Sequence, residues 1–181
     1  MRALQFEGVD GATGGDAPAV RSVEALYRRD HARLVGLAHW LVGDRAVGEE
    51  IVQEVFADLL VRETEVLRTV EPAAYARRAV VNRCRSRIRR LVLERRHAAA
   101  TDDFAHEHAI DPTVLDRVLA LPIRQRQCVV LRFYEDLTVD QIADDLGISA
   151  GSVKTHLHRA MKKLAVSLGA HAQSALPGRT P

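Results

Sequence analysis

Apolar residues recur every three or four positions through almost all of residues 22–168, a spacing typical of helices that bury one face. Clear examples are a predicted first helix near residues 22–42 and a predicted second helix near residues 46–62. No stretch of strand length shows convincing alternation of apolar and polar residues. The sequence therefore predicts an all-α protein.

Two kinds of segment interrupt this pattern. Residues 1–20 and 169–181 are rich in glycine, alanine, proline and small polar residues, so both are expected to be disordered tails. The apolar period also stops at residues 94–110, where alanines, acids and three histidines take over. We interpret this stretch as a flexible linker between two small helical domains, residues 21–93 and 111–168. Fully extended, the linker spans up to roughly 55–60 Å, more than one turn of B-DNA.

Capping residues mark the helices of the second domain. Asp111-Pro112, Pro122 and Ser149 suit helix starts, and Thr138-Val139-Asp140-Gln141 matches the S/T-x-x-E/Q capping box. Gly147 permits a sharp turn after the boxed helix. Four short helices are expected, and the last two form a helix-turn-helix whose second helix fits the DNA major groove. The alternative is an ordinary pair of packed helices with a basic exposed face.

The predicted third helix, residues 72–93, contains most of the unevenly distributed charge of a chain whose formal net charge is only +2. Nine arginines and one acid lie between residues 75 and 97. One helical stripe contains Arg78, Asn82, Arg85 and Arg89. Tyr75 lies near its edge, where an aromatic ring can stack on an unpaired base. We favour a nucleic-acid surface over a solvated face or a helix neutralised by the acidic second helix, because arginines outnumber acids too strongly for local pairing.

The outer face of the predicted second helix is acidic. Glu50, Glu54 and Asp58 recur at intervals of four, with Glu49 and Gln53 beside them. Such faces are usually only solvated. A positively charged protein partner is the second interpretation.

Catalysis, metal binding and cofactor binding have no support in the sequence. It contains no phosphate-binding glycine loop and no nucleophile elbow. The pairs His106-x-His108 and His156-x-His158 are poor metal ligands, because residues two apart on a helix point in different directions and cannot bind the same ion. No cysteine or carboxylate is placed to complete either set.

The sequence also indicates a cytoplasmic protein without membrane insertion. The first residues have no apolar core of the kind a signal peptide needs, and no apolar run approaches the length of a membrane helix. Cys84 and Cys128 match no metal spacing, and each sits within an apolar helical pattern. Two reduced core thiols are favoured, and a single disulfide stays open as an alternative.

The order of an acidic helix, an arginine-rich helix with Tyr75 and Asn82, a polar linker and a terminal helix-turn-helix resembles the ECF-type (extracytoplasmic function) sigma factors of bacterial RNA polymerase. The resemblance extends over residues 23–168. It implies that residues 21–93 are sigma region 2, a domain of three to four helices, and that residues 111–168 are sigma region 4. It also implies a protein without enzymatic activity or cofactor that binds core RNA polymerase and directs promoter-specific transcription initiation.

The resemblance gives each charged surface a partner. Residues 48–56 resemble the segment that docks on the clamp helices of the largest polymerase subunit, which implies polymerase contacts for Glu49, Glu50, Gln53, Glu54 and Asp58. Residues 72–90 resemble the segment that melts the minus-ten element and holds its bases, which implies DNA contacts for Tyr75, Arg78, Asn82, Arg85 and Arg89. Residues 151–160 resemble the start of the helix that reads the minus-thirty-five element, with contacts implied for Ser152, Lys154, Thr155, His156, Arg159 and Lys163.

The same resemblance implies two further features. Residues 66–71 correspond to a loop that captures a flipped base, a step that costs a few kcal/mol of unstacking. Members of the family are often held inactive by an anti-sigma protein that covers the same surfaces, so such a partner is a further implication.

Two other functions stay open on the sequence alone. A stand-alone helix-turn-helix transcriptional regulator would bind a symmetric duplex site tightly without polymerase. A nucleic-acid enzyme such as a recombinase would use the helix-turn-helix for targeting, although the sequence offers it no plausible nucleophile or metal set.

Overall fold

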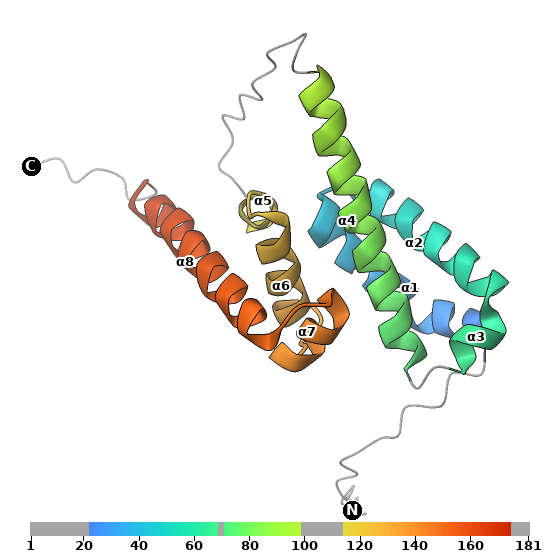
Figure 1. Ribbon diagram of the computed structural model, residues 1–181. Coiled ribbons are helices and arrows are strands. Elements are labelled where there is room, and N and C mark those ends of the chain that lie inside the picture. The colour runs from blue at the N-terminus through green and yellow to red at the C-terminus, as the bar shows by residue number, and fades with distance from the viewer. Residues whose placement is uncertain (1–21, 69–70, 99–113, 175–181) are drawn as a thin grey trace, which may run out of the picture.

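The computed structural model describes residues 22–68, 71–98 and 114–174 (Figure 1). Within these ranges the chain is helical apart from short turns and contains no strand, so the all-α prediction is confirmed. The helices are α1 (Val23–Val42), α2 (Arg45–Val61), α3 (Glu63–Leu67), α4 (Pro72–Ala98), α5 (Val114–Leu119), α6 (Ile123–Phe133), α7 (Val139–Leu146) and α8 (Ala150–Ser174). Residues 1–20, most of the predicted linker and residues 175–181 lie outside the described ranges.

Several helices begin at the capping residues that the sequence indicated. The Ser149 hydroxyl accepts a hydrogen bond from an amide in the first turn of α8 at 3.1 Å. Ser22, which was not predicted as a cap, does the same for α1 at 3.1 Å. At the start of α7, Thr138 and Gln141 form both hydrogen bonds of a capping box. Gly147 ends α7 in the left-handed conformation, with φ of 61°. These local signals fix the helix-turn-helix.

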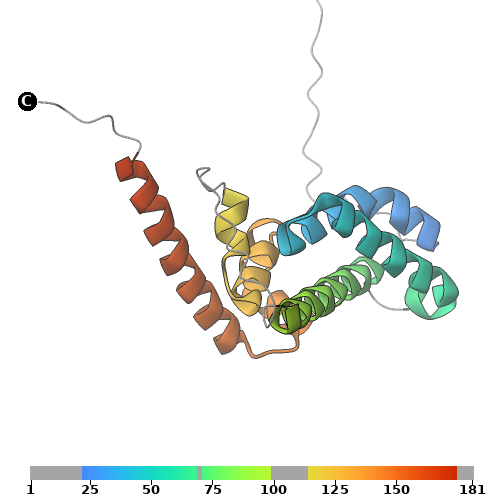
Figure 2. The ribbon, with the colours of Figure 1, turned by 90° about the horizontal axis from the view of Figure 1, so that it is seen from above.

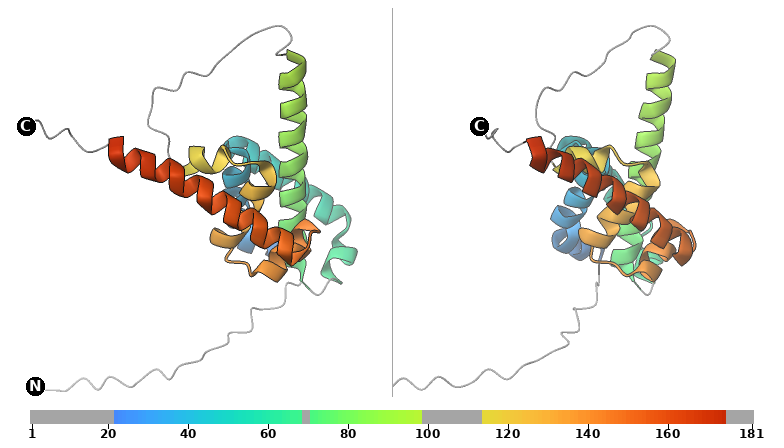
Figure 3. Two further views of the ribbon diagram at one scale, coloured as in Figure 1. Left: turned by 60° about the vertical axis from the view of Figure 1, so that its left-hand side comes forward. Right: turned by 90° about the vertical axis from the view of Figure 1, so that its left-hand side faces the viewer.

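Two helices are longer than the apolar period predicts. Helix α4 continues to residue 98 instead of ending near residue 93, and α8 continues to residue 174 instead of ending near residue 168. The expectation of four short helices in the second domain is therefore wrong for α8, which has 25 residues. Figure 3 shows the last turns of both helices extending beyond the helices that pack on them. A helix that projects in this way needs no apolar face, so periodicity gives no signal of its end.

The first domain packs α1, α2 and α4 together. Gly48 on α2 lies against α1, where a Cβ atom would stand 3.1 Å from the backbone nitrogen of His39. The missing side chain lets the two helices approach closely. Tyr27 and Phe56 meet edge to face across the same pair, with ring centroids 5.0 Å apart. This packing turns the charged side of α2 outward. Figure 2 shows α4 between α2 and the helices of the second domain.

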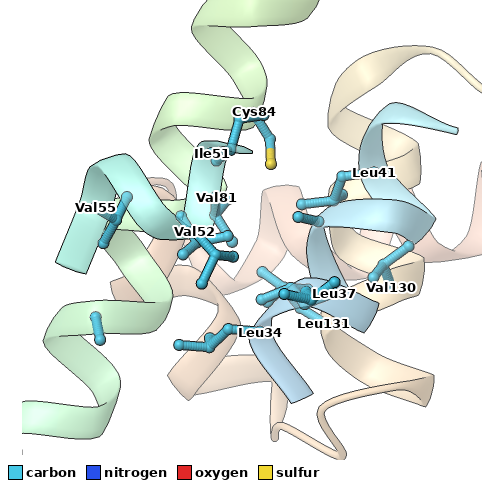
Figure 4. Close-up of a cluster of buried hydrophobic side chains, with 14 of the residues drawn as sticks. Leu34, Leu37, Leu41, Ile51, Val52, Val55, Val81, Cys84, Val130 and Leu131 are labelled. Carbon is cyan, nitrogen blue, oxygen red and sulfur yellow. The ribbon is translucent and has the colours of Figure 1, made fainter. Parts of the chain in front are cut away.

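One continuous core joins the two domains. Leu37 and Leu41 of α1 belong to the same buried cluster as Val130 and Leu131 of α6 (Figure 4). All four side chains have at most 3% of their surface exposed. The sequence predicted two helical domains joined by a linker, and the structure adds that the two domains pack directly against each other. Apolar stripes on separate helices do not reveal that they meet, which is why this contact was missed.

Both cysteines are free and buried, Cys84 in α4 and Cys128 in α6. They are therefore not joined in a disulfide. Burial raises the pKa of Cys84 to about 12 and the pKa of Cys128 to about 11. The reactive species is the thiolate, so both side chains are protected at neutral pH.

We expect neither cysteine of the native protein to react with Ellman's reagent at pH 8, whereas both should react once guanidinium unfolds the chain. The measurement is the number of thiols titrated before and after unfolding. Rapid reaction of one thiol per native chain would contradict the burial of these side chains.

Candidate nucleic-acid interface

A groove of about 500 Å³ separates α2 from α4. Its α2 wall presents the carboxylates of Glu50, Glu54 and Asp58, and its α4 wall includes Tyr75 and Asn82. Residues expected to contact polymerase and residues expected to contact bases therefore line one groove. The full lining consists of Glu50, Ile51, Glu54, Val55, Asp58, Leu59, Arg62, Tyr75, Ala79, Asn82, Arg83, Ser86, Arg87 and Arg90.

Arg83 bridges the groove. Its Nη1 donates a hydrogen bond to Glu54 Oε2 at 2.7 Å, and its Nη2 donates to Asp58. The hydrogen bond to Glu54 is the main reason why the pKa of Arg83 is raised, and the nearby charge of Asp58 adds to the effect. The acidic α2 thus neutralises one arginine of α4. Neutralisation by the second helix was the alternative to a nucleic-acid surface for the whole basic helix, and here it applies to Arg83. Sequence reasoning did not assign Arg83 a role, because its partners lie 25 and 29 positions away.

All five residues expected to contact polymerase are exposed on α2. They form two neighbouring stripes. Glu50, Glu54 and Asp58 face the groove toward α4. Gln53 instead lines a more apolar groove of about 520 Å³ beside Tyr27 of α1. A partner that covers the outer side of α2 would meet both stripes.

The residues expected to bind minus-ten DNA do not form one free surface. Tyr75, which is half-buried, and Asn82, which is exposed, line the groove toward α2. Arg78 faces the second domain, where its Nε donates to Asp145 Oδ1 at 2.9 Å. Arg89 is exposed near the projecting end of α4. Helical spacing correctly places these residues around α4, but it does not show which neighbouring helix covers each side of α4.

Arg85 lies between the domains. It is half-buried, and its Nε atom is buried without a hydrogen-bond partner. Burial lowers the pKa of Arg85, and the positive charges of Arg124 and Arg89 lower it further. The packed arrangement thus brings like charges together, which is unfavourable unless an anion lies between them.

The loop expected to capture a flipped base is partly helical. Val66 is fully buried within α3, and Leu67 ends that helix. Residues 69–70 lie outside the described ranges. Fewer residues than the predicted 66–71 are therefore left for a loop.

The helix α8 presents most of its expected DNA contacts on one exposed side. Ser152, Thr155, Arg159 and Lys163 fall within one stripe at 100° per residue, whereas Lys154 points about 200° away from Ser152. Thr155, Lys154, Arg159 and Lys163 are exposed, and Ser152 and His156 are half-buried. The Thr155 hydroxyl donates its proton to the carbonyl of Gly151 at 2.9 Å, so its oxygen is left to accept from a base amino group.

Other kinds of site find little support in the described part of the chain. It contains no group of three or more His, Cys, Asp or Glu side chains that could hold a metal ion. His156 and His158 lie on α8, whereas His106 and His108 lie outside the described residues. None of the described helices is long and apolar enough to cross a membrane.

Family models match both halves of the chain. Sigma-70 region 2 matches residues 26–93, and Sigma-70 region 4 matches residues 113–164. The first match includes α2 and the α4 segment with the groove, and the second includes the helix-turn-helix. The two matched segments agree with the two helical domains of the fold.

Relatives match over most of their length. The chain is 30% identical over 151 residues to RNA polymerase sigma-E factor of Streptomyces avermitilis, a match that spans 80% of this chain and 84% of that protein. It is also 30% identical over 170 residues to ECF RNA polymerase sigma factor SigL of Mycobacterium tuberculosis. That match spans 88% of this chain and 94% of SigL. The chain belongs to the ECF sigma factors of RNA polymerase, which direct transcription initiation at promoters.

Two solved structures share the fold. One is the sigma factor RpoE of Bartonella quintana in complex with the anti-sigma factor NepR, with a TM-score of 0.66 and 16% identity over 81% of this chain and 96% of that one. The other is CnrH in complex with the cytosolic domain of CnrY, with a TM-score of 0.58 and 22% identity. That match covers 82% of this chain and 88% of CnrH.

Proposed function

We propose that three sets of residues perform separate steps of initiation. Core RNA polymerase binds α2 through Glu49, Glu50, Gln53, Glu54 and Asp58. The melted minus-ten strand is held by α4 through Tyr75, Arg78, Asn82, Arg85 and Arg89. The minus-thirty-five duplex is bound by α8 through Ser152, Lys154, Thr155, His156, Arg159 and Lys163. The observation that carries the proposal is the groove in which Tyr75 and Asn82 lie opposite the exposed carboxylates of α2.

The groove explains why polymerase binding and strand opening belong together. Binding of a basic partner to Glu50, Glu54 and Asp58 would place polymerase against one wall of the groove, directly beside Tyr75 and Asn82. An unpaired base could then stack on the tyrosine ring, and the asparagine amide could pair with the base edge. The domain boundaries of this account are residues 21–93 and 111–168, with 94–110 as the connection.

The remaining parts of the proposal follow from this role. The protein supplies binding and orientation while polymerase performs the chemistry, so it has no enzymatic activity of its own. It acts in the cytoplasm, associated with the nucleoid through polymerase. An anti-sigma factor is a further proposed partner, since RpoE of Bartonella quintana, which shares the fold, was solved in complex with the anti-sigma factor NepR.

A gel-shift experiment distinguishes this function from that of a stand-alone regulator. We expect the purified protein alone to bind promoter duplex weakly, and to form a specific complex only when core polymerase is added. Tight, sequence-specific binding of the protein alone to a symmetric duplex site would overturn the proposal.

A further inference from the structure

One carboxylate fastens the helix-turn-helix to the basic helix. Asp145 of α7 accepts hydrogen bonds from Arg77 Nε at 2.6 Å and from Arg78 Nε at 2.9 Å. Its side chain is 2% exposed, whereas the side chains of Arg77 and Arg78 are 12% and 47% exposed. We call these two ion pairs the Asp145 contact.

The Asp145 contact acts between domains rather than within its own. Every hydrogen bond described for the Asp145 side chain goes to α4, 67 or 68 positions away in the sequence. The neighbouring acid Asp144 is exposed on the same helix. A carboxylate removed from water is costly unless it is paired, so the buried position of Asp145 depends on the packed arrangement of the domains.

Other polar contacts join the two domains through α1. Arg33 of α1 pairs with Glu135, and the Tyr134 hydroxyl donates to the Arg33 carbonyl at 3.2 Å. Arg126 Nη1 donates to the carbonyl of Leu41 at 2.6 Å. These contacts join α1 to the second domain, whereas the Asp145 contact is the one that occupies an arginine of the proposed minus-ten surface.

The packed arrangement differs from what two promoter elements require. Elements centred near positions minus ten and minus thirty-five lie about 25 base pairs apart, or roughly 85 Å at 3.4 Å per base pair. In the structure α7 touches α4 directly through Asp145. The two DNA-facing helices must therefore move apart before both elements are held at once.

We propose that Asp145 is an internal competitor of promoter DNA. It occupies Arg78 in the packed state, and a DNA phosphate must displace it as the domains separate. The inference rests on the proposed role of Arg78 in minus-ten binding. The crowding of Arg85 and Arg124 at the same interface favours the exchange, because an incoming phosphate would relieve it.

The test compares Asp145→Asn with Asp144→Asn in the full-length chain. Both variants remove one negative charge from α7, but only the first removes the Asp145 contact. Binding to a short fluorescein-labelled single-stranded DNA of arbitrary sequence is measured by anisotropy at low salt, because Arg78 is proposed to hold the melted strand. We expect Asp145→Asn to bind about tenfold more tightly than the wild type, and Asp144→Asn to differ from the wild type by less than about threefold, because only the first raises the fraction of binding-competent chains.

A second measurement follows the separation of the domains. Dyes are attached to Ala57→Cys on α2 and Lys162→Cys on α8, both exposed positions, while the two native cysteines stay buried. Energy transfer should report a longer mean distance for Asp145→Asn than for Asp144→Asn. Arg77→Gln removes one of the two ion pairs without changing a proposed DNA residue, so it should lengthen the distance as well, although by less. This variant covers the case in which Asp145→Asn does not fold.

Two results together would overturn the role of Asp145. One is that Asp145→Asn and Arg77→Gln give the same energy transfer as Asp144→Asn. The other is that Asp145→Asn binds DNA with the same affinity as Asp144→Asn. Initiation by core polymerase is scored separately. A wild-type chain that supports no initiation rejects the proposed function. A functional sigma factor whose variants are indistinguishable rejects only the competitor role of Asp145.

Discussion

Replacing Glu50 and Glu54 together with alanine is expected to lower the affinity of the protein for core RNA polymerase about tenfold to a hundredfold. Both carboxylates are exposed on α2, so their removal should leave the fold intact. Only Glu54 has a described ion pair, and its partner Arg83 keeps Asp58. The loss should therefore appear in partner binding and in its dependence on salt rather than in thermal stability.

The measurement is a titration of labelled core polymerase with wild-type and variant protein, together with thermal unfolding of each. The matched control is Glu65→Ala with Asp144→Ala, which removes two exposed acids on α3 and α7. Equal polymerase affinity for the Glu50 and Glu54 variant and the control would show that the acidic face of α2 is only solvated.

Replacing Arg159 with alanine is expected to lower initiation from promoters with an intact minus-thirty-five element roughly tenfold to a hundredfold. Arg159 is exposed on the same stripe of α8 as Ser152 and Thr155, where a guanidinium can bind a guanine edge through two hydrogen bonds. Lys154 points to another side of the helix. Its replacement by alanine should weaken binding to all sequences equally and reduce the salt slope by about one.

The two variants are compared by transcription from a promoter with an intact upstream element and from one in which that element is scrambled. Arg28→Ala, which removes an exposed arginine on α1, is the charge-matched control. The account is contradicted if Arg159→Ala reduces initiation from both promoters by the same factor, because that result would leave α8 without a role in reading sequence.

Local features of the fold could be predicted from the sequence because neighbouring residues determine them. Thr138, Ser149 and Gly147 act on the amides and carbonyls of their own helix ends, so a few residues specify each boundary. The exposed stripe of Glu50, Glu54 and Asp58 follows from helical spacing for the same reason.

The arrangement of the helices could not be predicted in this way. Asp145 lies in a helix whose other acids are exposed, and its burial depends on two arginines that are distant in the sequence. The predicted basic stripe divides because α2 covers one side of α4 and α7 covers another. Contact between domains depends on tertiary packing, which spacing along a single helix does not encode.

The most direct test of the account is the mapping of transcript start sites on a promoter library transcribed by core RNA polymerase with and without this protein. The account predicts new start sites that depend on the protein and share sequence elements near positions minus ten and minus thirty-five. Start sites that are the same in both reactions, or new ones without shared upstream sequence, would contradict it.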